Sequence, residues 1–282
     1  MSVITQRVGT RRLWRELGAL RAFLLRDVDL TKRYLLWDVV WLVYNIINAF
    51  IIGLIGISSG AAPAYAGGQP YVFYLLIGAV MWSYLSALFH VVSETVAWER
   101  WEGTLEYTFM APVHRLTHLL GVCGFATLYG IVRIIIMLLL LMWCFHIDLH
   151  RANIPAALIS LVVGSFAMIG LGLIGAVMPL LSPEKGQQAT HILLALFLLV
   201  SGVYYPITVL PHWVQPLAYA SPAYWALLAQ RRALLEGTPV NGMWDVLGAL
   251  MLSGVLFIPL GYFTFSLAER YAKRVGLLKR SG

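Results

Sequence analysis

Six apolar segments, each long enough or nearly long enough to cross a bilayer, limit the folds that this sequence can adopt. A helix needs about 20 largely apolar residues to span the hydrocarbon core. Only 12% of the 282 residues are charged, against about 25% in a soluble domain, so a polar surface cannot cover all these segments. We expect an integral membrane protein. The segments are residues 37–57, 70–93, 118–145, 154–181, 188–205 and 245–267.

The apolar segments are predicted to be helices. They are continuous and lack the two-residue alternation of a transmembrane barrel strand. In lipid, a helix satisfies all its backbone polar groups within one segment. The predicted fold is therefore all-α, with six transmembrane helices over residues 37–267. A cytoplasmic segment, 1–36, precedes them and a basic tail, 268–282, follows.

The basic residues predict the orientation of the chain. With six spans, both termini lie on one side of the membrane, and so do 16 of the 20 Lys and Arg residues. Positive charge is enriched on the cytoplasmic side, so both termini are predicted to be cytoplasmic. The same clustering beside apolar segments argues against nucleic acid as a partner, despite a net charge of +7. Eight basic residues lie in 1–33 and five follow Tyr262, and the others are Arg100, Arg115 and Lys185.

Residues 11–27 have the pattern of an amphipathic helix, with leucines on one stripe and arginines opposite. This pattern predicts an interfacial helix on the cytoplasmic leaflet, with the arginines towards anionic head groups. A positively charged anchor without any further role would fit the same residues. The stripe consists of Leu13, Leu17, Leu20 and Leu24, and the arginines are Arg11, Arg12, Arg15 and Arg26.

Four prolines interrupt the segment between the last two predicted spans. Proline prevents a single long helix, yet the pieces 211–219 and 222–235 are apolar and aromatic. We expect a short re-entrant or outer helical hairpin within 206–236, with its backbone satisfied by protein or water. The prolines are Pro206, Pro211, Pro216 and Pro222.

Arg133 is the most unusual residue within the apolar segments, because a charge at the centre of a membrane helix costs about 2.5 kcal/mol or more. Two interpretations remain open: a group that faces the bundle interior and contacts an anionic substrate, or one member of a structural pair. In the next segment, Gly172 and Ala176 permit close helix packing, either within the chain or between two copies.

The sequence lacks the phosphate-binding loop GxxxxGK[ST] that an ATP site requires. Lys185 lies in "SPEKGQQ", without the upstream glycine or the following hydroxyl. Nucleotide hydrolysis would therefore need another chain, and no cofactor is expected on this one. Two histidine pairs, His114 with His118 and His146 with His150, have i, i+4 spacing, and Asp148 lies between the latter. Neither pair has a convincing third ligand, so no metal site is predicted.

A charged stretch, 94–115, separates the second and third apolar segments and reads "ETVAWERWEGTLEYTFMAPVHR". It resembles the cytoplasmic loop of type-2 ABC exporter permeases, with its GTLE and A-P-V-x-R elements. A second stretch, 201–225 ("SGVYYPITVLPHWVQPLAYASPAYW"), resembles the outer segment of the same family. The matching loop residues are Glu102, Gly103, Thr104, Leu105, Glu106, Ala111, Pro112, Val113 and Arg115.

In that family the loop forms a coupling helix that sits in a cleft of the nucleotide-binding subunit. The resemblance implies two ABC ATPase subunits, which bind ATP and Mg, and a second permease subunit, identical or different, in a bacterial plasma (inner) membrane. A merely solvated acidic turn would fit the same loop. The expected contacts to the ATPase are Trp98, Glu99, Trp101, Glu102, Gly103, Thr104 and Glu106, with Glu184 and Lys185 in the second cytoplasmic loop.

The resemblance implies a transport subunit without an active site of its own, which exports an amphiphilic or hydrophobic substrate such as a drug or a lipid-like molecule. A permease for a lipid-linked polysaccharide or glycoconjugate is the nearest alternative. A membrane-embedded enzyme or channel that uses Arg133 and the histidine pairs is a further alternative. The candidate residues of the substrate path are Arg133, Tyr74, Trp82, Tyr204 and Tyr205.

Overall fold

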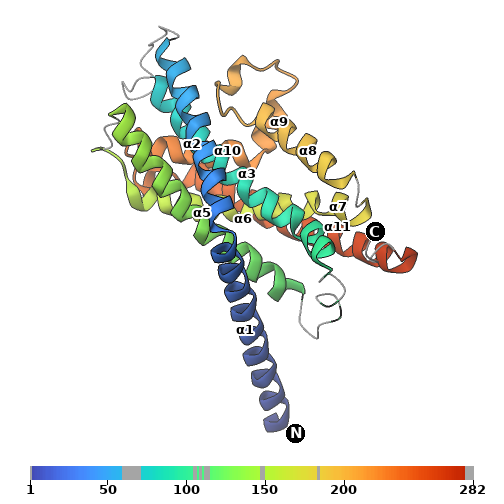
Figure 1. Cartoon of the computed structure of the whole chain (residues 1–282). Helices are drawn as coiled ribbons and strands as arrows, with labels where there is room; N and C mark the ends of the chain where they lie inside the picture. Colours follow the sequence, from blue (N-terminus) through green and yellow to red (C-terminus); the bar gives the residue numbers. More distant parts are fainter. Residues whose placement is uncertain are drawn as a thin grey trace.

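The computed structural model describes residues 2–58, 71–103, 107, 110, 115–146, 150–182 and 185–276. Its regular elements are all helices, and the described residues contain no β-strand (Figure 1). The long helices are α1 (Ser2–Arg33), α2 (Leu35–Ser58), α3 (Tyr71–Glu102), α5 (Arg115–Phe145), α6 (Ile154–Gly175) and α11 (Trp244–Val275). The shorter ones are α7 (Val177–Leu181), α8 (Gly186–Val200), η2 (Ile207–Val209), α9 (Gln215–Ala220), α10 (Pro222–Leu234) and η3 (Val240–Gly242).

Five helical stretches among the described residues are long and apolar enough to cross a membrane, and they coincide with five of the six predicted spans. The predicted segment 188–205 corresponds to α8, which has only 15 residues. A helix of that length is about 22 Å long, shorter than a hydrocarbon core of about 30 Å. The all-helical membrane fold is confirmed, with five candidate spans among the described residues, while the sixth span stays a prediction. The five stretches are Leu35–Ser58, Tyr71–Thr95, Leu120–Phe145, Ile154–Leu181 and Trp244–Val275.

The spans differ greatly in how much of their surface the chain covers. Buried residues make up 72% of the α3 span and 61% of the span formed by α6 and α7, but only 17% of each of the α2 and α5 spans. Glycines allow the central helices to approach closely. A Cβ on Gly261 of α11 would lie 2.5 Å from the backbone oxygen of Gly170 of α6, and one on Gly172 would lie 2.8 Å from Cβ of Val92 of α3. Gly172 therefore packs within the chain.

Helix α10 lies inside the bundle, where the sequence predicted a re-entrant or outer hairpin. Its start agrees with the predicted piece 222–235, but the helix is buried against α3, α6 and α11. Small residues permit this packing: Ala226 is fully buried, and its Cβ lies against Gly164 of α6. Gln230 donates from Nε2 to the backbone oxygen of Ala157 at 2.7 Å and so joins α10 to α6.

Arg231 of α10 stabilises the irregular backbone that follows α8. Its guanidinium donates to the backbone oxygens of Gly202, at 3.0 Å, and Val203, at 2.7 Å. It also lies 3.4 Å from the ring centroid of Tyr74 of α3. Non-helical backbone at membrane depth must have its carbonyls satisfied. A buried arginine supplies those donors here.

Helix α1 continues almost directly into α2. Backbone hydrogen bonds cross the turn at Tyr34, whose nitrogen donates to Leu30 and whose oxygen accepts from Asp38. In Figure 1, the N-terminal part of α1 extends away from the other helices.

Part of the predicted leucine stripe of α1 faces α5. Leu20 and Leu24 are half-buried, whereas Leu17 is exposed. A Cβ on Gly121 of α5 would lie 2.7 Å from Cβ of Phe23, so α1 and α5 are closely packed. The amphipathic face thus serves helix packing in part, and the predicted position of 11–27 at a membrane surface remains a proposal.

Candidate functional site

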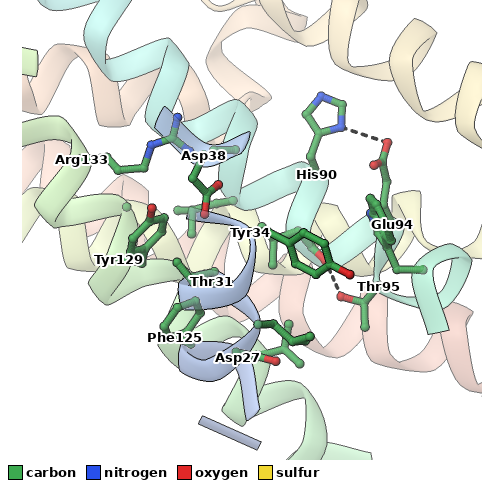
Figure 2. Close-up of a pocket in the computed structure, with 18 of the residues that line it drawn as sticks. Asp27, Thr31, Tyr34, Asp38, His90, Glu94, Thr95, Phe125, Tyr129 and Arg133 are labelled. Atoms are coloured by element: carbon green, nitrogen blue, oxygen red, sulfur yellow. Dashed lines mark hydrogen bonds and ion pairs between the residues drawn. The ribbon is translucent and has the colours of Figure 1, made fainter. Parts of the chain in front are cut away.

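A cavity of about 710 Å³ lies between α1, α2, α3 and α5 (Figure 2). Its lining residues extend along α3 from Val80 to Glu102 and along α5 from Val122 to Met137. At 1.5 Å per residue, the α3 side is about 33 Å long, comparable to the thickness of a hydrocarbon core. The cavity is therefore an elongated groove that follows α3.

Arg133, Asp38 and Tyr129 form a polar group on one wall of this groove (Figure 2). The Tyr129 hydroxyl and the Arg133 guanidinium both act on the Asp38 carboxylate electrostatically. The guanidinium carbon lies 6.0 Å from the centroid of the Tyr129 ring. Both interpretations of Arg133 therefore find support: it has a charged neighbour within the chain, and it is half-buried where it lines the groove.

Glu99 joins three helices at the end of the groove where α3 ends. It belongs to the 98–115 stretch, which is the part of the predicted 94–115 loop from Trp98 onward. Its Oε1 lies 3.0 Å from His118 Nε2 on α5 and 3.4 Å from an Arg26 nitrogen on α1. Glu99 is only 4% exposed. The sequence placed Glu99 among the contacts to a partner, but the structure turns it inward, where α1 and α5 cover it.

Asp27 lies beside this cluster and lines the groove. Burial raises the pKa of its carboxyl above the ordinary value, and the nearby Arg26 guanidinium partly opposes the shift. The Arg26 Nε atom is 3.2 Å from an Asp27 carboxylate oxygen. Arg26 thus contacts two carboxylates, so the charge at this end of the groove is largely compensated within the chain.

The 98–115 stretch begins as the last turn of α3. Gly103 ends the helix with a φ of 74°, a left-handed conformation that glycine adopts at little cost. Trp98 is 55% exposed and Glu102 is also exposed, and both contribute to the groove. Further along, Tyr107 and Met110 are about four-fifths exposed.

The other predicted contact residues are only partly described. Lys185 immediately precedes α8 and is exposed. Three of the predicted contacts, Thr104, Glu106 and Glu184, lie outside the described residues, as does the side chain of Trp101.

The aromatic candidates of the substrate path lie elsewhere, and the described residues that line the groove do not include them. Tyr74 is buried, and its hydroxyl donates to the Gly202 oxygen at 3.3 Å. The Tyr204 backbone oxygen accepts from Tyr71 at 3.0 Å. Of the five candidates, Arg133 alone belongs to the described groove lining. The others are Tyr74, Trp82, Tyr204 and Tyr205, and all but Tyr205 pack against the core or its edge.

Two residues of importance carried no clear signal in the sequence. Arg231 lies in the segment that was expected to form a hairpin, and Asp38 lies near the start of the first span. An acidic residue within an apolar segment that also faces another intramembrane charge is a functional hypothesis by default.

A family model described as "ABC-2 type transporter" matches residues 20–235, which include the whole groove and the 98–115 stretch. The chain belongs to the ABC-2 type transporter family. Among curated proteins, no significant match was found. The protein is thus a multi-pass membrane protein and the permease component of an ABC transporter. ABC-2 permeases work with an ATPase subunit and generally have no ATP site of their own, in agreement with the missing phosphate-binding loop.

Within this ABC-2 permease, α3 carries both a wall of the groove and exposed side chains at its C-terminal end. These exposed side chains are Trp98 and Glu102. Since a helix is a stiff element, displacement of its exposed end would change the shape of the groove beside it. The arrangement can therefore couple a contact at the end of α3 to an event in the groove.

Proposed function

We propose that this permease exports an amphiphilic or hydrophobic cargo, drug-like or lipid-like, through the α1–α2–α3–α5 groove. The observation that carries the proposal is that α3 forms a wall of the groove and also carries the exposed Trp98 and Glu102 at its C-terminal end. ATP-driven closure of two ATPase subunits would move the ends of α3 in two permease copies and open the groove outward.

The dimensions and chemistry of the groove support such a cargo. Its volume of about 710 Å³ falls within the range of roughly 300–1,000 Å³ that is typical of sites for drug-sized ligands. Side chains such as Leu88, Ile134 and Met137 offer apolar walls, while Arg133 and Tyr129 offer donors on one side. An amphiphile would place its polar or anionic group beside Arg133 and its apolar part along α3 and α5.

The exposed side chains of the 98–115 stretch support its role as the contact to the ATPase. Trp98, Tyr107 and Met110 expose large apolar surface, which is typical of anchors in protein interfaces. Glu102, with Glu106 of the same motif, offers negative charge to a basic cleft. Glu99 would act indirectly, by holding the end of α3 against α1 and α5.

The proposed topology keeps six crossings and cytoplasmic termini in a bacterial inner membrane. The fifth crossing would consist of α8 and the following residues to 205, which Arg231 joins to the bundle. The clustering of 16 of 20 basic residues on one side supports this orientation. Large exposed apolar surfaces on α2 and α5 would face lipid or a second permease subunit.

The test is charge reversal in the coupling stretch, with the permease and its ATPase reconstituted in proteoliposomes. We expect Glu102→Lys with Glu106→Lys to reduce ATP-dependent cargo transport by at least tenfold while the complex still hydrolyses ATP. Glu236→Lys, an exposed glutamate in a different part of the chain, is the matched control and should transport normally. Normal transport by the double variant would refute the coupling role.

A further inference from the structure

His90 and Glu94 of α3 and His191 of α8 bring three metal-ligating side chains together. Each residue offers a ligand atom, and these atoms all lie within 4.8 Å of one another. His90 Nδ1 is 3.3 Å and His191 Nδ1 is 3.9 Å from Glu94 Oε1, and the two imidazole centroids are 4.9 Å apart. Because 101 residues separate the histidines, their spacing in the sequence gives no hint of this cluster.

The ligand set and its dimensions fit zinc. Two histidines and one glutamate, with water in the fourth position, are an established tetrahedral Zn²⁺ set. Zinc–ligand bonds of about 2.0–2.1 Å place tetrahedral ligand atoms about 3.3 Å apart. The His90–Glu94 separation already has this value, and His191 requires a shift of well under 1 Å relative to Glu94.

The cluster lies at the surface of the chain. The side chains of His90 and Glu94 are 31% and 17% exposed, and that of His191 is 63% exposed, so the protein leaves the cluster open on one side. His191 Nδ1 also lies 2.8 Å from the Gln187 backbone oxygen, so a bound ion would replace this hydrogen bond or bind the other ring nitrogen. His90 and Glu94 share one face of α3 because they are four residues apart, and Figure 2 shows both at the groove.

The geometry points to a Zn²⁺ site formed by His90, Glu94 and His191. A bound ion would tie α3 to the second turn of α8, which begins directly after Lys185. An ion pair between protonated histidine and Glu94 would explain the His90–Glu94 contact alone. Such an ion pair would not account for the second imidazole, that of His191, in the same small volume, whereas a metal site would.

The site can be tested on the full-length chain in detergent, purified without a polyhistidine tag and stripped with a chelator. Titration with Co²⁺ should produce the visible absorption of a tetrahedral complex at one equivalent, and Zn²⁺ should displace it. We expect His191→Ala to weaken Co²⁺ binding at least tenfold and His191→Cys, which restores a zinc ligand, to retain it. His150→Ala, which alters a histidine distant from the cluster, is the matched control and should bind like the unaltered chain.

A second measurement separates loss of binding from loss of folding. Saturating Zn²⁺ should raise the Tm of the unaltered chain and of His150→Ala but not that of His191→Ala, because a ligand stabilises only the state that binds it. Equal Co²⁺ binding by the unaltered chain and by His191→Ala would overturn the proposal. Absence of the absorption band together with an unchanged Tm would overturn it as well.

Discussion

Arg133 and Arg231 are both arginines on apolar helices, yet their surroundings differ completely. Arg231 is 8% exposed, and its guanidinium donates to backbone oxygens and covers the Tyr74 ring. Arg133 is half-buried in the groove, where the Asp38 carboxylate and the Tyr129 ring are its neighbours. The donors of Arg231 are used by the fold, whereas Arg133 faces a volume that can hold a ligand.

The comparison separates a charge that holds the fold together from a charge that is accessible to a ligand. Either kind must be compensated, because an isolated charge in hydrocarbon is costly. The two arginines differ in which groups they contact and in whether the guanidinium lines a cavity. Removing a charge that satisfies irregular backbone should cost much stability, while a charge that lines a cavity can be replaced by a neutral polar group at little cost.

The largest expected effect is on the stability of an Arg231→Met variant. Removing the guanidinium leaves the Gly202 and Val203 carbonyls buried without these donors, so the free energy of unfolding should fall by about 3–5 kcal/mol. Thermal unfolding of the purified chain in detergent would measure this loss. Arg232→Met is the neighbouring control: its 2.7 Å pair with Asp245 is exposed and contributes at most about 1 kcal/mol. Equal losses in both variants would contradict the structural role of Arg231.

A smaller loss of stability is expected for Glu99→Ala. The change leaves His118 and Arg26 without a buried carboxylate, and removal of one partner from a buried polar contact costs about 1–3 kcal/mol. Glu102→Ala, one turn along the same helix and exposed, should change the free energy of unfolding by less than about 0.5 kcal/mol.

The same two glutamates should have the opposite order in a binding assay. Glu102→Ala should weaken the association of the permease with its ATPase more than Glu99→Ala does. The association is measured with the two purified components. If Glu99→Ala left stability unchanged but abolished association, Glu99 would be a direct contact, as the sequence first suggested.

The sequence predicts much of the membrane fold, because continuous apolar segments can satisfy their backbone in lipid only as helices. It is less informative about α8, whose apolar character continues past the end of the helix at Val200. The buried position of α10 was also not predictable. Its prolines suggested a break in the chain but could not show that Ala226 and Gln230 would fit against α6.

The candidate site, like the fold, could be predicted only in part from the sequence. The exposed end of α3 could be recognised from a local motif, since Trp98, Glu102 and Gly103 lie within six residues. The partners of Arg133 and Glu99 come from other helices, and so does the third member of the His90–Glu94–His191 cluster. Such contacts depend on how helices pack, which one sequence does not reveal.

The most direct test of the groove as the cargo path is cargo-stimulated ATP hydrolysis by the reconstituted complex with Arg133→Gln. Because Arg133 lines a cavity, the free energy of unfolding of this variant should lie within about 1 kcal/mol of that of the unaltered chain. An anionic amphiphile should nevertheless stimulate its ATP hydrolysis at least tenfold less than that of the unaltered complex. Arg133→Lys should retain more of the stimulation than Arg133→Gln. Full stimulation of Arg133→Gln at unchanged stability would contradict the account.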